Sequence, residues 1–195
     1  MSSVVVAIRR GPVVGCLPVN AALYCSILYS KTLRPADSMR FNLVDKITSI
    51  EAGTKVTAVK NLSLAEEYLQ DHFPGFPVMP GVLMLESLVQ ASAWLMRLSS
   101  DFEYSTVLMK EARALKFNSF LKPGDTMVVT STLHKQDGPT QFQFKATGEV
   151  NGVSTVSARL TLEQFNLADR NADLDKIDKD LIRQMQELFN QLQAA

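Results

Sequence analysis

The sequence has very few cysteines and no excess of charge of either sign. Its two cysteines are Cys16 and Cys25, so residues 39–195 contain none and a disulfide scaffold is excluded for them. Basic and acidic side chains number 20 each, which argues against a nucleic-acid-binding surface. Two histidines without ligand-like spacing predict no metal site, and no phosphate-binding or dinucleotide motif occurs. We therefore expect neither a cofactor nor a nucleic-acid partner.

What is present is an ordinary globular composition, with 46% hydrophobic and 21% charged residues. Such a composition excludes a disordered tail protein and a collagen-like repeat. A chain of this length buries roughly 70% of its extended surface around a single core. One main domain is therefore expected, spanning residues 39–163 between two extensions.

Residues 1–38 differ from the rest because they hold four basic side chains and only one acidic one. Arg9 and Arg10 precede an apolar stretch, as in a targeting sequence, but prolines interrupt that stretch and it is too short for a membrane span. We favour an unstructured extension ahead of Met39, which opens the first patterned segment. No membrane span and a cytoplasmic location are expected.

The next segments predict a β-hairpin. Residues 40–50 are rich in β-branched and apolar side chains, and residues 54–62 alternate after a glycine turn. Ser63 and Glu66 then fit a capping box, in which the two side chains satisfy free amides at the start of a short helix.

A proline-glycine loop and a long helix follow. Residues 71–81 contain three prolines and two glycines, which exclude regular structure and predict a rigid, shaped loop. The helix is expected from Pro80 to about Leu98, with proline at its first position. It is apolar on nearly every side, so it must be wrapped by other structure.

The remaining body predicts more strands. Candidates lie at 106–118, 126–135 and 140–150, and an Asn-Gly hairpin signal leads into a last strand over 153–162. The expected fold class is α+β, with a long central helix wrapped by a five- to six-stranded antiparallel sheet.

The C-terminal extension, residues 164–195, predicts an appended amphipathic helix. Its apolar residues recur at helical spacing and place one stripe against the body or a partner subunit. The stripe consists of Leu174, Ile177, Leu181, Met185, Leu188 and Leu192.

The candidate catalytic residues are two titratable side chains. His72 lies in the proline-glycine loop, and Glu86 lies one and a half turns inside the apolar helix. Each alone has a structural explanation, as a packed imidazole or a hydrogen-bonded core carboxylate. Gly81 at the helix start adds a free amide at the positive end of the helix dipole, which suits a developing oxyanion.

These residues carry a resemblance. The run HFPGFPVMPGVL from His72, followed by Glu86 and Gln90, is similar to the active-site signature of β-hydroxyacyl-acyl carrier protein dehydratases of the FabZ type, relatives of FabA. The interval of 14 residues from His72 to Glu86 is the family's interval, and the resemblance extends over roughly residues 41–162.

The resemblance implies a hot-dog fold and a dimer with active sites between subunits, with a trimer of dimers as a larger assembly. It implies that His72 is the catalytic histidine and that Glu86 is the catalytic acid, contributed by the opposite subunit. Gly81 would polarise the thioester carbonyl through its amide, and Gln90 would hold the Glu86 carboxylate.

The implied activity is removal of water from a (3R)-3-hydroxyacyl thioester of acyl carrier protein, in fatty acid biosynthesis, giving the trans-2-enoyl thioester. FabA-type enzymes, which also isomerise the double bond, carry Asp where this chain has Glu86, so dehydration alone is favoured. The alternatives are a hot-dog acyl thioesterase and a non-catalytic acyl-binding subunit.

The implied partner is acyl carrier protein with its phosphopantetheine-linked acyl chain. Because that carrier is acidic, docking on basic residues near the site is expected. The candidates are Lys110, Arg113, Lys116 and Lys122.

Overall fold

The computed structural model describes residues 4–6 and 41–195. Apart from Val4–Val6, the expected extension over 1–38 lies outside the described residues, as do both cysteines and Met39. Leu43–Ala195 belong to one compact unit.

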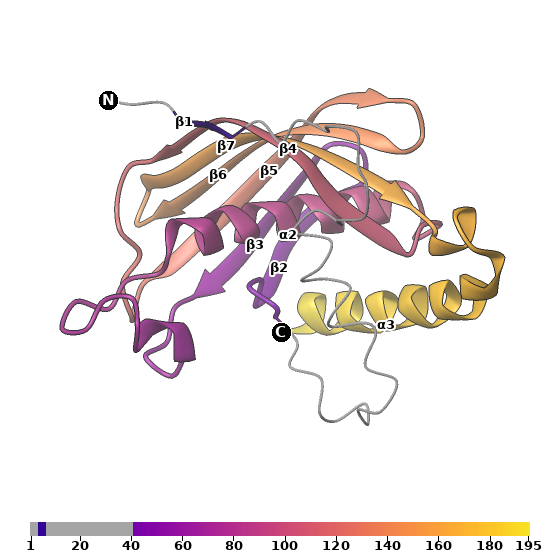
Figure 1. The fold of residues 1–195 in the computed structure, drawn as a ribbon. Helices are drawn as coiled ribbons and strands as arrows, with labels where there is room; N and C mark the ends of the chain where they lie inside the picture. Colours follow the sequence, from indigo (N-terminus) through magenta and orange to yellow (C-terminus); the bar gives the residue numbers. More distant parts are fainter. Residues whose placement is uncertain (1–3, 7–40) are drawn as a thin grey trace, which may run out of the picture. The chain divides into compact units, whose positions relative to one another are not determined.

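One antiparallel sheet forms most of the structure (Figure 1). Within residues 41–195 its strands are β2 (Lys46–Glu51), β3 (Lys55–Asn61), β4 (Thr106–Phe117), β5 (Thr126–Asp137), β6 (Gln141–Val150) and β7 (Val153–Phe165). Their spatial order is β4-β7-β6-β5-β3-β2, which confirms the predicted strands after the central helix.

A further short strand, β1 (Val4–Val6), pairs antiparallel with the outer edge of β4. It lies in the segment that we expected to be an unstructured extension. Three consecutive valines, which are β-branched, have the residue type that strands favour.

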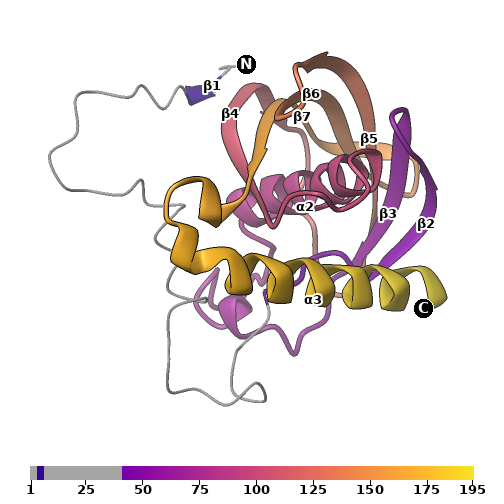
Figure 2. The ribbon, with the colours of Figure 1, turned by 90° about the vertical axis from the view of Figure 1, so that its right-hand side faces the viewer.

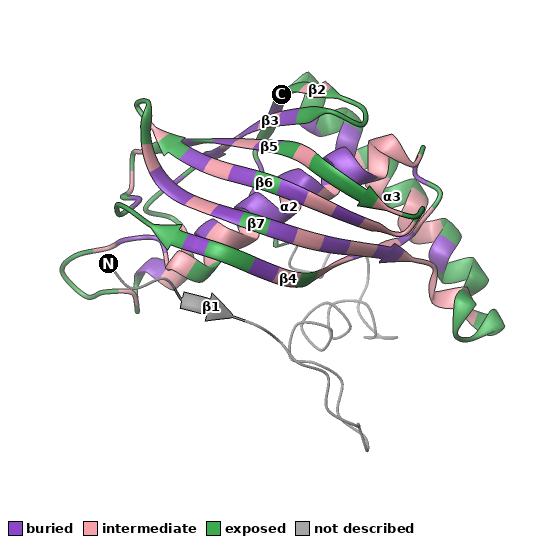
Figure 3. Cartoon of the chain, turned by 90° about the horizontal axis from the view of Figure 1, so that it is seen from above, coloured by how far each residue is buried: buried purple, intermediate pink, exposed green. Residues whose placement is uncertain are grey.

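The central helix α2 (Gly81–Ser99) runs along the concave side of the sheet, as predicted (Figures 1 and 2). Figure 3 shows buried residues alternating with exposed ones along the strands that cover it. Polar groups on the buried side of the helix are satisfied: the Ser92 hydroxyl donates to the Leu88 carbonyl and bonds with the Ser131 hydroxyl of β5. The helix can therefore hold serines inside an apolar core.

The predicted hairpin is confirmed, but its first strand begins later than expected. Leu43 and Val44 are buried one after the other, which is not the alternation of a strand. The Leu43 amide donates to the Gln90 side chain of α2 at 2.9 Å rather than to a neighbouring strand. The segment before β2 is thus tied to the helix instead of the sheet.

The predicted capping box is wrong. The helix there is a single 3-10 turn, η1 (Glu67–Leu69), and Glu66 precedes it without a capping hydrogen bond from its side chain. The Ser63 hydroxyl accepts only from the Ala65 amide, and the Glu66 carboxylate pairs with Lys60 of β3. The attraction of a buried ammonium group outweighs the local cap.

The C-terminal helix α3 (Asp175–Ala194) packs on the body, along the side of α2 that the sheet leaves open (Figure 2). The Phe189 ring lies 5.9 Å from the Trp94 ring of α2 and 5.5 Å from the Phe102 ring. The predicted stripe is only partly correct, because Ile177 is exposed while Phe189 and Asp178 are buried. The packed face includes Phe189 because its ring finds two aromatic partners, Trp94 and Phe102, on the body.

Asp178 fastens α3 to the body. This carboxylate is buried and accepts hydrogen bonds from the Ser105 hydroxyl and from the amides of Leu167 and Ala168, the latter two at 3.0 and 2.8 Å. Those amides belong to η2 (Leu167–Asp169), which is joined to α3 through η3 (Ala172–Leu174). A buried carboxylate with three donors is satisfied and holds the turn of chain before α3 in place.

Replacing Asp178 with asparagine is expected to lower the free energy of unfolding by about 2–3 kcal/mol, because one carboxylate oxygen becomes an NH2 group and the backbone amide that donated to that oxygen loses its acceptor. Urea unfolding followed by circular dichroism measures the change. The exposed Asp173 is the control, and Asp173→Asn is expected to change stability by less than about 0.5 kcal/mol. Equal stability of the two variants would contradict the role assigned to Asp178.

Candidate functional site

The loop that carries His72 is fixed at both ends by hydrogen bonds. The His72 amide donates to the Tyr68 carbonyl at 3.2 Å, and the Val78 amide donates to the His72 carbonyl at 3.1 Å. Val78 and Met79 are fully buried, and the Met79 amide donates to the Leu121 carbonyl at 2.9 Å. The predicted rigid loop is therefore present, and its rigidity comes from main-chain contacts as well as from proline.

The His72 ring has a defined tautomer. Its Nδ1 lies 3.0 Å from the Val78 carbonyl oxygen. Because a carbonyl can only accept, Nδ1 carries the proton and the Nε2 lone pair of the neutral ring points elsewhere. The ring also stacks on Phe73, with 4.1 Å between centroids. The geometry thus leaves Nε2 available to take a proton from another molecule.

Glu86 and Gln90 are brought together on α2. The Gln90 amide nitrogen donates to the Glu86 carboxylate at 3.1 Å, while the Gln90 oxygen accepts from the Leu43 amide. An oxygen engaged by a backbone donor leaves only the NH2 group to face Glu86, so the orientation of the amide is determined. Gln90 therefore holds the Glu86 carboxylate on a half-buried face of the helix.

Gly81 is the first residue of α2. Pro80 is the N-cap of the helix, whereas the sequence predicted it as the first helical residue. In the first turn the Gly81 amide has no acceptor within the helix. The Phe117 ring of β4 covers this glycine so closely that a Cβ atom would lie 3.0 Å from the ring. The small residue thus lets an aromatic wall approach a free amide at the helix start.

The structure joins the predicted residues in two groups. Glu86 and Gln90 share a hydrogen bond on α2, whereas the hydrogen bond of the His72 ring goes to Val78 within the preceding loop. Gly81 lies between these groups in sequence, where the loop passes into the helix.

The four basic candidates do not form one cluster. Lys110 binds Gln141 and lies 3.7 Å from Glu163, and Arg113 pairs with Glu111 at 2.8 Å, all on the sheet. The ammonium group of Lys122 instead lies 5.3 Å above the Phe76 ring, in the loop that carries His72. Lys116 is exposed on β4, opposite Ser157.

Sequence reasoning missed a group of aromatic side chains around this loop. The rings of Phe76 and Phe120 meet edge to face at 5.7 Å, and both are exposed, as are Phe73 and Phe117. Exposed phenylalanines therefore lie beside both candidate residues: Phe73 stacks on the His72 ring, and Phe117 at the end of β4 covers Gly81. The sequence did offer a signal for this group: two phenylalanines lie in the proline-glycine loop and two more lie at and just after the end of β4.

Within residues 4–6 and 41–195, no group of three or more side chains is arranged to hold a metal ion. No helix in the same residues is long and apolar enough to cross a membrane.

A long helix in the concave side of one antiparallel sheet defines the hot-dog class. Among solved structures, the dehydratase heterocomplex ApeI:P from Xenorhabdus doucetiae has a TM-score of 0.56, covering 69% of this chain and 90% of that chain at 17% identity. The shared fold confirms the architecture expected from the sequence.

The family follows from the sequence match. Residues 35–159 match the FabA-like domain, and the chain belongs to this family. It is 36% identical over 118 residues to the 3-hydroxyacyl-acyl-carrier-protein dehydratase FabZ of Levilactobacillus brevis, covering 60% of this chain and 79% of that protein. The FabZ protein of Thiobacillus denitrificans is 35% identical over 125 residues, covering 62% of this chain and 84% of that protein.

Proposed function

We propose that this chain removes water from (3R)-3-hydroxyacyl thioesters of acyl carrier protein and gives trans-2-enoyl thioesters, as a hydro-lyase of fatty acid biosynthesis. The observation that carries the proposal is the hydrogen bond from His72 Nδ1 to the Val78 carbonyl, which leaves Nε2 as a base in the loop before α2. Membership of the FabA-like family and the similarity to FabZ proteins support it.

In the proposed reaction, His72 Nε2 takes the proton from the α-carbon while charge develops on the thioester oxygen. The Gly81 amide faces that oxygen, since a free donor at a helix start stabilises an enolate-like transition state. Glu86, held by Gln90, gives a proton to the β-hydroxyl, and water leaves as the carbon–carbon double bond forms. The cycle closes when His72 releases the α-proton to solvent and Glu86 takes up a proton, so that only the elements of water leave the substrate.

We propose that the working unit is a homodimer in which Glu86 comes from the partner subunit. Membership of the FabA-like family and the hot-dog fold shared with a dehydratase heterocomplex support this arrangement. The exposed phenylalanines beside the loop supply an apolar surface for the acyl chain and the second subunit.

The test is incubation of the purified protein with 3-hydroxyacyl carrier-protein thioesters of several chain lengths, followed by mass spectrometry. Loss of the mass of one water, with the thioester intact, supports the proposal. Release of free carrier thiol identifies a thioesterase instead. Binding without turnover identifies a non-catalytic acyl-binding subunit.

Lys122 is the basic residue that we propose for carrier docking, because it alone of the four candidates lies over a ring of the His72 loop. Lys122→Glu is expected to raise the KM for a carrier-protein substrate about tenfold at low salt and to leave kcat unchanged, since one attraction becomes a repulsion. The KM for a carrier-free thioester serves as the reference. Lys179→Glu on α3 is the matched control; an equal rise in KM for that variant would remove the docking assignment.

A further inference from the structure

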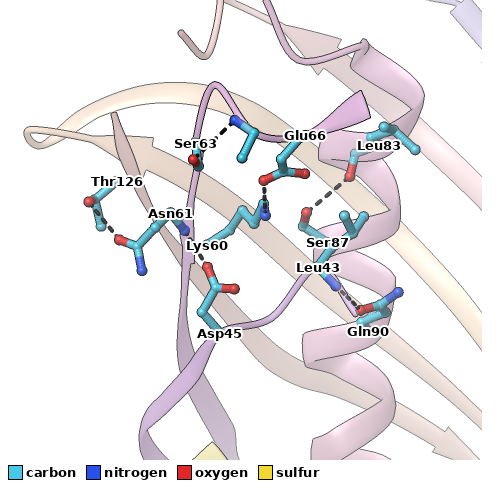
Figure 4. A network of polar contacts seen from close by, with 11 residues as sticks. Leu43, Asp45, Lys60, Asn61, Ser63, Glu66, Leu83, Ser87, Gln90 and Thr126 are labelled. Carbon is cyan, nitrogen blue, oxygen red and sulfur yellow. Dashed lines mark hydrogen bonds and ion pairs between the residues drawn. The ribbon is translucent and has the colours of Figure 1, made fainter. Parts of the chain in front are cut away.

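A buried ion pair lies between β3 and the segment that leads into the His72 loop. Lys60 Nζ is 2.5 Å from a Glu66 carboxylate oxygen, and the Lys60 side chain is only 5% exposed. Figure 4 shows the two side chains pointing toward one another beside α2. The dehydration chemistry described above uses neither residue.

The position of Lys60 is unusual for its type. Val56, Ala58 and Lys60 occupy the inward-facing positions of β3, and all three are buried. A lysine on the core face of a strand costs free energy unless its charge is paired. The Glu66 carboxylate supplies that pairing, so the lysine determines where the start of η1 must lie.

The Lys60 end of this pair is more deeply buried than the Glu66 end. The Tyr68 hydroxyl is, among the described residues, the one buried side-chain polar atom without a hydrogen-bond partner. Burial, and then the neighbouring Glu66 carboxylate, raise the pKa of Tyr68. Because the Lys60 side chain is only 5% exposed and that of Glu66 21%, water screens their attraction less than it screens that of a surface pair.

The contacts continue from the ion pair to the imidazole. Glu66 is the residue before η1. Within η1, the main-chain carbonyl of Tyr68 accepts a hydrogen bond from the His72 amide at 3.2 Å. His72 is then bonded to Val78 twice: its carbonyl accepts from the Val78 amide, and its ring Nδ1 donates to the Val78 carbonyl. One end of the His72 loop is therefore tied, through a single helical turn, to a side chain of the rigid sheet.

We propose that Lys60 and Glu66 are positioning residues for His72: the ion pair fixes η1 against β3 and thereby sets the place of the imidazole relative to the substrate. This inference rests on the proposed dehydratase function for its kinetic consequences and on the contacts alone for its structural ones. Neither residue is proposed to touch the substrate.

The kinetic test uses Glu66→Gln, which keeps the size of the side chain and removes its charge. We expect kcat to fall about 10- to 100-fold with KM changed less than about twofold, because a shift of the order of 1 Å in a reacting group has effects of this size. Lys60→Arg, which keeps the charge, is expected to retain kcat within about threefold. Lys60→Met is expected to behave like Glu66→Gln.

Asp178→Asn is the matched control, since it also weakens a buried carboxylate but lies at α3, in contact with Ser105 and η2. It is expected to lower the melting temperature and leave kcat unchanged. If Glu66→Gln and Lys60→Met lower the melting temperature in the same way and also leave kcat unchanged, the pair only stabilises the fold and the proposal is overturned.

A second readout needs no activity. The chain has two histidines, His72 and His134, and His134 is exposed on β5. In NMR spectra of the labelled protein, Glu66→Gln is expected to shift the ring and amide signals of His72, while those of His134 stay in place. Asp178→Asn is expected to shift neither. Unchanged His72 signals in Glu66→Gln would overturn the proposal even if the wild-type protein proved not to be a dehydratase.

Discussion

Replacing His72 with alanine is expected to lower kcat for dehydration by about 100- to 10,000-fold, because a positioned general base contributes that much to the rate. The variant loses both the Nε2 lone pair and the hydrogen bond to Val78. Steady-state formation of the trans-2-enoyl thioester, followed by its ultraviolet absorbance, measures the change.

The control for this experiment is His134→Ala, which removes the other histidine from an exposed position on β5. It is expected to retain wild-type kcat. A His72→Ala variant that is folded and forms product at near wild-type rate would show that the base is elsewhere.

Glu86→Gln is expected to have the second large effect, also about 100- to 10,000-fold in kcat. Glutamine fills the same space beside Gln90 and can still hydrogen-bond to it, but it cannot donate a proton to a departing hydroxyl. The reaction therefore loses its acid while α2 keeps its packing.

The measurement is again enoyl product formation, combined with a thermal melt to show that the helix is intact. Glu86→Asp keeps an acid at this position and is expected to retain more activity than Glu86→Gln. Equal activity of Glu86→Gln and wild type would mean that the carboxyl group is structural.

Much of the fold was predictable because its signals are local. The apolar run of α2, the alternation in β5 to β7 and the Asn-Gly turn each act within a few residues, so their bounds were predicted closely. The errors came where a distant partner decided the outcome. Glu66 pairs with Lys60 instead of forming the predicted cap. The Leu43 amide donates to the Gln90 side chain instead of to a neighbouring strand.

The candidate site divides in the same way. The residue types at 72, 81, 86 and 90 were visible in the sequence because they lie in one continuous motif. The tautomer of His72 was not predictable, since it depends on how the loop folds back to bring Val78 to the ring. The tie from Lys60 to the loop was also hidden, because only strand alternation hinted that this lysine faces inward.

The C-terminal helix has a practical consequence. The family match ends at residue 159, yet α3 beyond it covers Trp94 and Phe102 with the Phe189 ring. A chain that lacked α3 would expose these rings to water, and exposed apolar patches promote aggregation. Whoever expresses this protein should keep its last thirty or so residues, even though they carry none of the proposed chemistry.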